Sequence, residues 1–325
     1  MFRNRIFKIA STEEFEQLTL EIFQYQSENN TVYKQFLAFL EFDTTSVKKI
    51  TDIPFLPIDF FKQFEVITGK SESKEIFLSS GTTGSVQSKH FVTDLSVYEE
   101  SYIKSFELFY GPIKDYTMLA LLPSYQEREG SSLIYMADDL IKKSNNLDSG
   151  FYLDDLDKLA KKLKDLNAKG SNILLIGVTY ALLDLIEKHQ FNLQNAIVME
   201  TGGMKGKRRE MVREELHNKL CKGFGVTTIH SEYGMTELLS QAYSMGNGIF
   251  ETPPWMKILI RDPEDAFTYL PNFKSGGINV IDLANCNSCS FIATQDLGKL
   301  HSDNTFEVLG RFDHADIRGC NLLIN

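Results

Sequence analysis

Apolar and amphipathic segments alternate through the middle of this 325-residue chain. Short apolar runs predict strands, and segments whose apolar residues recur every three or four positions predict helices. The strands are predicted at residues 116–122, 172–178, 196–200 and 226–230, and the helices at 154–167, 180–189 and 207–222. This order predicts an α/β fold with a mostly parallel sheet covered by helices.

The two ends of the chain have different patterns. Residues 11–42 are predicted to be helical, and Ser11 with Glu14 has the spacing of a capping box. Short strands are predicted after residue 250, at residues 256–260, 278–283, 290–294 and 305–309. We therefore expect an α/β core over residues 1–250 and a small β-rich subdomain over residues 251–325.

Charge and hydrophobicity exclude several classes of protein. The formal net charge is −10, and the longest basic run is Lys205-Gly206-Lys207-Arg208-Arg209, so nucleic-acid binding is not expected. No apolar run approaches the roughly 20 residues that cross a membrane. The N-terminus lacks the apolar segment of a secretory signal. We expect a soluble cytoplasmic protein whose four cysteines are reduced.

Two of the cysteines form a CxxC pair, Cys286-Asn287-Ser288-Cys289, between two predicted strands. A structural zinc site needs four ligands, and no second pair is present in the sequence. The pair therefore predicts a hairpin turn rather than a metal site.

A loop of small residues follows the predicted strand at residues 76–78. It reads Ser79-Ser80-Gly81-Thr82-Thr83-Gly84-Ser85-Val86-Gln87-Ser88-Lys89. Glycine lets backbone N–H groups approach an anion, and the hydroxyl groups add further donors, so the loop suits a polyphosphate. An exposed turn has the same composition, and the Gly-Lys-Ser/Thr ending of a P-loop is missing.

Further segments, in this order, make the chain resemble the adenylate-forming enzymes, the superfamily of acyl-CoA synthetases and luciferases. The small-residue loop is followed by Thr201-Gly202-Gly203, Tyr233-Gly234-Met235-Thr236-Glu237, residues 276–282, Ala293-Thr294-Gln295-Asp296-Leu297-Gly298 and residues 310–319. The resemblance covers roughly residues 55–320 and implies activation of a carboxylic acid by ATP and Mg²⁺.

The resemblance also implies a role for each matched residue. Ser80, Gly81, Thr82, Thr83 and Gly84 would hold the ATP phosphates, with added charge from Lys89. Tyr233, next to Gly234, would stack on adenine, which Gly202 and Gly203 allow close to the backbone. Thr236 would contact a phosphate or the acyl carboxylate, and Glu237 would ligate Mg²⁺. Asp296 would bind the ribose, Arg311 would lie near the ribose and phosphate, and Asp313 matches the hinge before a mobile C-terminal domain.

The hinge motif lies close to residue 325, so the mobile domain and its adenylation lysine are expected to be absent. In this respect the chain is most similar to the LuxE-type acyl-protein synthetases. That similarity implies transfer of a fatty acyl group to Cys320 and onward to a partner such as an acyl reductase. Two alternatives remain at this stage: an acid–thiol ligase that uses CoA or an acyl-carrier protein, and a non-catalytic nucleotide-binding subunit.

Overall fold

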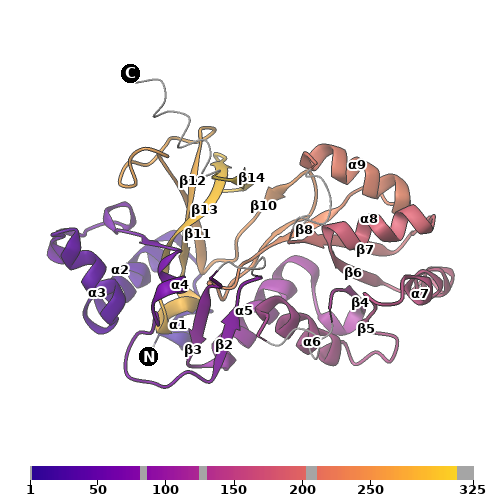
Figure 1. The fold of residues 1–325 in the computed structure, drawn as a ribbon, viewed down its shortest axis with the longest axis horizontal. Coiled ribbons are helices and arrows are strands. Elements are labelled where there is room, and N and C mark those ends of the chain that lie inside the picture. The colour runs from indigo at the N-terminus through magenta and orange to yellow at the C-terminus, as the bar shows by residue number, and fades with distance from the viewer. Residues whose placement is uncertain (1, 81–85, 124–129, 203–210, 313–325) are drawn as a thin grey trace. The chain divides into compact units, whose positions relative to one another are not determined.

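The computed structural model describes residues 2–80, 86–123, 130–202 and 211–312 (Figure 1). The chain forms two compact units. Unit 1 contains Met1–Lys74, His90–Thr93 and Pro254–Asn325, and unit 2 contains Glu75–Lys89 and Asp94–Pro253. Each unit has its own sheet, and each is described by itself below.

Unit 2 is built on a mostly parallel sheet with the strand order β5-β4-β6-β7-β8-β9. The first five strands are parallel neighbours, and β9 is antiparallel to β8. The strands of this sheet are β4 (Thr117–Leu121), β5 (Gly150–Phe151), β6 (Ile173–Val178), β7 (Ala196–Thr201), β8 (His230–Tyr233) and β9 (Ala242–Ser244). Unit 2 also contains β2 (Glu75–Leu78) and β10 (Ile249–Phe250), which are not part of this sheet. The predicted α/β class with a mostly parallel sheet is therefore confirmed.

Helices connect the parallel strands and cover both faces of this sheet. They are α5 (Leu95–Tyr110), η3 (Ile113–Asp115), α6 (Ser132–Ser144), α7 (Leu156–Ala168), α8 (Thr179–Lys188) and α9 (Arg213–Phe224). Figure 1 shows α5 and α6 on one side of the strands and α8 and α9 on the other. All six residues of β6 are buried, because a central parallel strand is covered on both faces.

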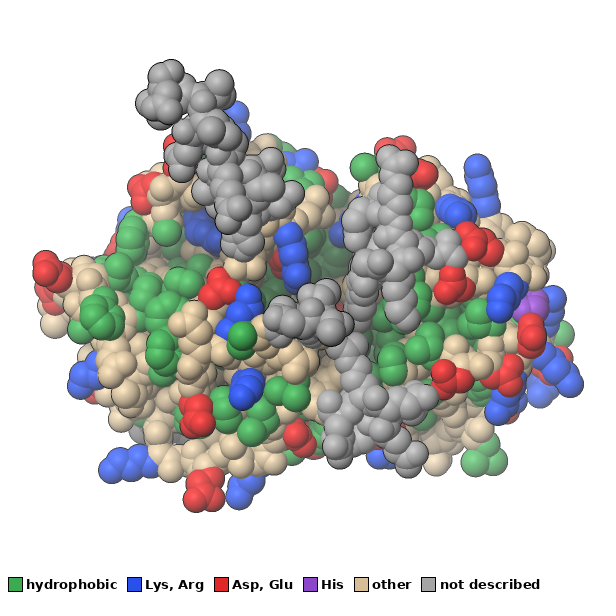
Figure 2. All heavy atoms as spheres, viewed as in Figure 1, with side chains coloured by type: hydrophobic (Ala, Val, Ile, Leu, Met, Phe, Trp, Pro, Cys, Tyr) green, Lys and Arg blue, Asp and Glu red, His purple; other side chains and the backbone are tan. Residues whose placement is uncertain are grey.

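Local sequence signals explain these helices. The Asp155 side chain caps α7 by accepting from the backbone N–H of Lys158, at 2.9 Å. Leu159, Leu163 and Leu166 then face the core. Lysines and acidic residues occupy the outer surface, and Figure 2 shows the two charges interspersed where α7 lies. The amphipathic pattern of the sequence therefore determines which face of the helix packs inward.

Unit 1 contains an antiparallel sheet in which β11, β12, β13 and β14 are successive neighbours. Its elements are α1 (Arg3–Ile6), α2 (Thr12–Asn29), α3 (Thr31–Phe39), η1 (Thr44–Ser46), η2 (Ile50–Asp52), β1 (Leu56–Pro57), α4 (Phe60–Gln63), β11 (Met256–Arg261), β12 (Ser275–Asp282), η4 (Leu283–Asn287), β13 (Phe291–Leu300) and β14 (Phe306–Arg311). The remaining described strand is β3 (Lys89–Val92). The β-rich character predicted after residue 250 is confirmed.

The structure divides the chain differently from the predicted boundary at residue 250. A boundary does fall between Pro253 and Pro254, but the N-terminal residues belong with the C-terminal strands. Strand β1 pairs in parallel with β13, and the Gln26 amide donates to the Asn285 and Cys286 carbonyls at 3.0 and 3.1 Å. These contacts join segments about 236 to 260 residues apart, which local sequence patterns cannot reveal.

Several predicted elements have different bounds in the structure. The helical region at residues 11–42 is split at Asn30, whose side chain caps α3 and donates to the Ser288 carbonyl at 2.8 Å. The strand predicted at 226–230 is instead β8, His230–Tyr233. The helix predicted at 207–222 is described from Arg213 to Phe224, and it ends at Gly225, which has a positive φ of 69°.

The CxxC segment connects two antiparallel neighbours, β12 and β13, as the predicted hairpin turn requires. Cys286 and Cys289 are both buried. Burial raises the pKa of the Cys289 thiol to about 12, so this cysteine is protonated at neutral pH. Within the described ranges, no group of three or more His, Cys, Asp or Glu side chains could hold a metal ion.

The described helices differ from membrane-spanning helices in length or hydrophobicity. No helix in the described part of the chain is both long enough and apolar enough to span a bilayer.

Candidate active site

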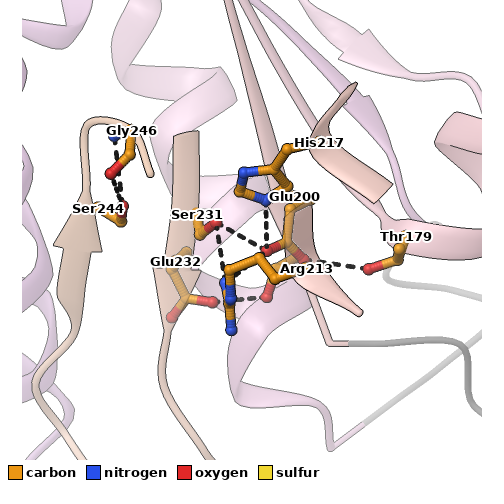
Figure 3. Close-up of polar contacts among 9 residues, drawn as sticks. Thr179, Glu200, Arg213, His217, Ser231, Glu232, Ser244 and Gly246 are labelled. Atoms are coloured by element: carbon orange, nitrogen blue, oxygen red, sulfur yellow. Dashed lines mark hydrogen bonds and ion pairs between the residues drawn. The ribbon is translucent and has the colours of Figure 1, made fainter. Parts of the chain in front are cut away.

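Polar side chains gather at the carboxyl edge of the parallel sheet in unit 2 (Figure 3). Thr179 directly follows β6, Glu200 and Thr201 end β7, and Ser231 and Glu232 lie in β8. In the sheet register, Glu200 is the neighbour of Ser231. Ligand sites in open α/β sheets form at this edge, because the loops that follow the strands converge there.

Glu200 is the centre of this polar group. Its Oε1 accepts hydrogen bonds from the Ser231 hydroxyl at 2.7 Å and from Arg213 Nη1 at 3.1 Å. Its Oε2 accepts from the Thr179 hydroxyl at 3.1 Å, and His217 Nε2 lies 3.6 Å from Oε1. Burial alone would raise the pKa of Glu200. Its contacts with His217, Arg213 and Ser231 outweigh burial and hold the pKa below its usual range, so the carboxylate is charged at neutral pH.

Arg213 begins α9 and reaches back over the end of β7. Its guanidinium carbon lies 5.2 Å from the centre of the Phe250 ring, close enough for a cation–π contact. Gly248 makes room for the arginine, because a Cβ at that position would lie 2.3 Å from Arg213 Cδ. The arginine is therefore held by an aromatic ring as well as by the Glu200 carboxylate.

A second carboxylate, Glu232, belongs to the residue directly before the Tyr233–Glu237 motif. Its Oε2 accepts from the Thr201 hydroxyl at 2.6 Å, which links β8 to β7. A Cβ on Gly234 would lie 2.4 Å from Glu232 Oε1. A side chain at position 234 would therefore require the Glu232 carboxylate to move.

The Tyr233–Glu237 motif itself runs from the end of β8 into the following turn. Tyr233 lies opposite Ala242 of β9, and its ring contacts Phe250 edge-on with the ring centres 6.0 Å apart. Thr236 is half-buried, and the Glu237 side chain is only 5% exposed. A hydrogen bond of 3.1 Å from the Leu238 N–H to the Met235 carbonyl closes the turn.

The other nucleotide-site residues predicted in unit 2 are partly described. Gly202 follows β7 with a positive φ of 72°, a conformation that favours glycine. Ser80 follows β2, and Lys89 is the exposed first residue of β3. Five residues predicted for the site lie outside the described residues: Gly81, Thr82, Thr83, Gly84 and Gly203. The predicted acyl acceptor Cys320 and the hinge residue Asp313 lie outside them as well.

The structure brings together the two site residues predicted in unit 1. Asp296 of β13 and Arg311 of β14 are direct cross-strand neighbours, and Arg311 Nε lies 3.1 Å from Asp296 Oδ1. The Asp296 N–H donates to the Thr294 hydroxyl at 3.1 Å. The carboxylate is mostly buried while the arginine is 78% exposed.

A separate pocket of about 320 Å³ lies in unit 1. Its wall is mainly apolar and includes Phe36, Phe55 and Phe267, with Arg261 and Asn279 among its polar residues. None of the residues predicted for the site lines this pocket.

The donor sets fit the cofactors that the sequence implies. Mg²⁺ is usually held by one or two carboxylates together with substrate phosphates and water, so the single carboxylate of Glu237 is a suitable protein ligand. Backbone N–H groups near Gly202 and the hydroxyl of Thr236 are donors that a nucleotide can use. Asp296 offers two acceptor oxygens of the kind that bind ribose hydroxyls.

The sequence interpretation missed the polar group around Glu200. Glu200-Thr201 and Ser231-Glu232 both follow apolar segments at the ends of parallel strands, and this repeated placement was a usable signal. Arg213 carried no such signal. It lies in a helix with several charged residues, and only the fold shows that it faces a buried carboxylate.

Comparison with solved structures identifies the fold. ATP-bound MatB from Rhodopseudomonas palustris matches with a TM-score of 0.54 and 19% identity, over 73% of this chain and 47% of that one. An open conformation of 2-hydroxyisobutyryl-CoA ligase, in complex with 2-HIB-AMP and CoA, matches with a TM-score of 0.67 and 11% identity. That match covers 93% of this chain and 70% of the ligase.

The same ligase in the postadenylation state, in complex with 2-HIB-AMP, matches with a TM-score of 0.63 and 13% identity, over 93% of this chain and 68% of that one. No protein-family model matches the chain, and no curated protein matches it. The chain thus shares its fold with MatB and with 2-hydroxyisobutyryl-CoA ligase, and it spans about half the length of MatB.

Proposed function

We propose that this protein activates a carboxylic acid with ATP. A carboxylate oxygen of the acid attacks the α-phosphorus of ATP, and the bond from that phosphorus to the pyrophosphate oxygen breaks. The products are an acyl-adenylate and pyrophosphate. Both reactants are anions, so the site must supply a cation and hydrogen-bond donors where negative charge develops.

One observation carries this proposal: Tyr233-Gly234-Met235-Thr236-Glu237 lies at the carboxyl edge of the parallel sheet, in a fold shared with ATP-bound and acyl-AMP-bound ligases. The structural matches share only 11–19% identity with this chain and support the fold. The motif residues themselves support the site.

The described residues have distinct roles in this proposal. Glu237 would hold Mg²⁺, which would supply positive charge beside the phosphates, and Thr236 would donate to a phosphate or to the acyl carboxylate. Tyr233 packs against adenine beside the open backbone of Gly202. Asp296 accepts from the ribose hydroxyls, and Arg311 supplies positive charge near the ribose and phosphate. Ser80 and Lys89 belong to the phosphate loop.

We further propose that the acyl group passes to the protein itself. The Cys320 thiolate attacks the acyl carbon, the bond from that carbon to the phosphate oxygen breaks, and AMP leaves with the proposed thioester remaining on sulfur. A thiolate is strongly nucleophilic, and a tethered thiol makes the transfer effectively unimolecular. A partner protein such as an acyl reductase would then receive the acyl group, which we expect to be a long-chain fatty acyl group.

The test is to incubate the protein with ATP, Mg²⁺ and carboxylic acids of graded chain length, and to record both pyrophosphate release and intact mass. Wild-type protein should gain one acyl mass that hydroxylamine removes. Cys320→Ala should still release pyrophosphate but gain no mass. Cys221→Ala is the matched thiol control, since Cys221 is a partly exposed cysteine of α9 with no predicted role, and it should label normally.

A second function is favoured by one observation: 2-hydroxyisobutyryl-CoA ligase was solved with CoA as well as 2-HIB-AMP. In that case pyrophosphate release is accompanied by an acyl-CoA product and no mass gain on the protein. ATP binding without pyrophosphate release for any acid would contradict both enzymatic proposals and favour a nucleotide-binding subunit.

A further inference from the structure

Glu200, Arg213 and Ser231 form a buried connection that we call the Glu200 clamp (Figure 3). Its three members come from the end of β7, the first residue of α9 and the middle of β8. Ser231 and Arg213 both donate to the same carboxylate oxygen, at 2.7 and 3.1 Å. Arg213 Nη1 also lies 3.3 Å from the Ser231 hydroxyl. Each member therefore contacts both of the others.

The clamp lies next to the residues proposed to bind the nucleotide. Glu200 precedes Gly202 by two residues, and Ser231 precedes Tyr233 by two. In β8, Ser231 and Tyr233 are two residues apart on one strand and so point to the same face, and Gly202 follows the end of β7. A bond between the Glu200 and Ser231 side chains therefore restrains the rotation of both strands directly before Gly202 and Tyr233.

Charge and burial make this restraint stiff. The Glu200 side chain is about 10% exposed and Arg213 about one-third exposed. Removing one member of a buried pair leaves the other charge uncompensated, so the strand ends must rearrange to hydrate it. The Phe250 ring packs against the Arg213 guanidinium, and Gly248 leaves space for the Arg213 side chain because it has no Cβ. Its position is therefore defined by packing as well as by charge.

We propose that Glu200 and Arg213 are positioning residues for the nucleotide: they act through the ends of β7 and β8 and hold Gly202 and Tyr233 in the spacing that adenine requires. This inference rests on the proposed function. It assigns neither residue a direct contact with ATP. Misplacing binding groups by about 1 Å can cost up to roughly a hundredfold in rate.

The experiment measures KM for ATP, kcat for pyrophosphate release and the thermal unfolding midpoint of six proteins: the wild type, Arg213→Gln, Arg213→Lys, Glu200→Gln, the double variant Glu200→Gln/Arg213→Gln, and Glu187→Gln. Glu187→Gln is the matched control. Glu187 pairs with Lys219 at 3.2 Å and so also tethers α9 to its neighbour α8, but on the exposed surface.

We expect Arg213→Gln to raise KM for ATP by roughly tenfold or more while kcat at saturating ATP changes less, because the groups that contact the reacting atoms remain. Arg213→Lys should recover part of the loss, since lysine restores the charge but not the fork geometry. The double variant Glu200→Gln/Arg213→Gln should be no worse than Arg213→Gln alone, because the two act as one pair.

Equal KM values for ATP in Arg213→Gln, Glu200→Gln and the wild type would overturn the inference. A rise in KM for ATP in the control Glu187→Gln as large as that in Arg213→Gln would overturn it as well. If Arg213→Gln does not fold, Arg213→Lys and Glu200→Gln carry the same test. An inactive wild-type protein would instead contradict the proposed function, so the two failures are distinguishable.

Discussion

Two arginine–carboxylate pairs in this protein have the same separation and different surroundings. Arg213 lies 3.1 Å from Glu200 in unit 2, and Arg311 lies 3.1 Å from Asp296 in unit 1. Arg213 is 31% exposed and packs on Phe250, whereas Arg311 is 78% exposed. The exposed arginine is free to exchange its partner for water, and the packed one is not.

The kind of sheet explains the difference. In unit 2, parallel strands bring Thr179, Glu200 and Ser231 to one edge, and α9 returns across that edge. In unit 1, Asp296 and Arg311 are cross-strand neighbours of an antiparallel ladder, and β14 has exposed residues at its end. Distance alone is therefore a poor guide to what an ion pair contributes, because solvent exposure decides the balance of desolvation and attraction.

The largest effect is expected from a third buried carboxylate, Glu237. Glu237→Gln keeps the shape of the side chain but removes the charge that we propose binds Mg²⁺. We expect pyrophosphate release to slow by about 10²–10³-fold. Glu251→Gln is the control, because Glu251 is an exposed glutamate of the same unit. Similar rates in both variants would show that burial at this edge serves folding and not chemistry.

The next effect compares the two arginines directly. Arg213→Gln leaves the Glu200 carboxylate buried without its cation, so we expect the free energy of unfolding to fall by about 2 kcal/mol. Fully buried pairs lose about 3–5 kcal/mol when one partner is removed, and the partial exposure of Arg213 reduces this. Urea unfolding followed by circular dichroism measures the change. A loss below about 0.5 kcal/mol would place this pair in the same class as an exposed one.

The pH dependence of folding stability gives a smaller effect, which is specific to the Glu200 carboxylate. The pKa of Glu200 is lower in the folded state than in the unfolded chain, so the unfolded state binds more protons as the pH falls. The contribution of the charged Glu200 carboxylate to folding stability is complete above the pKa that Glu200 has in the unfolded chain. It is lost as the pH falls through the pKa that Glu200 has in the folded protein.

We therefore expect the stability of the wild type to fall more steeply below about pH 5 than that of Glu200→Gln. The difference in slope is at most about 1.4 kcal/mol per pH unit. Glu187→Gln should follow the wild-type slope, and parallel curves for wild type and Glu200→Gln would refute the assigned charge state.

The smallest effect on stability is expected from Arg311→Gln. An exposed pair contributes about 0–1 kcal/mol, so unfolding should change by no more than about 0.5 kcal/mol. If Arg311 lies near the ribose and phosphate as proposed, KM for ATP should still rise severalfold. A large loss of stability with unchanged KM would reverse the comparison between the two pairs.

Much of the fold was predictable because it depends on local patterns. The buried strand β6 and the amphipathic helix α7 follow from apolar runs and helical periodicity. The start of β8 was misplaced by four residues, because His230-Ser231-Glu232-Tyr233 is polar and is a strand only through its neighbours β7 and β9. The polar side chains of Ser231 and Glu232 form hydrogen bonds with residues of β7, and the sequence of one segment alone cannot show these bonds.

The sequence by itself determined the chemistry offered at the site: the Tyr233–Glu237 motif, the glycines that precede it, and Asp296 and Arg311 in order along the chain. Tertiary structure alone decided that residues 1–74 complete the unit of the C-terminal strands and that Arg213 faces Glu200. The physical reason is the distance along the chain over which each kind of interaction acts. Motifs and periodicity act over a few residues, whereas strand pairing and the burial of charge depend on which distant segments pack together.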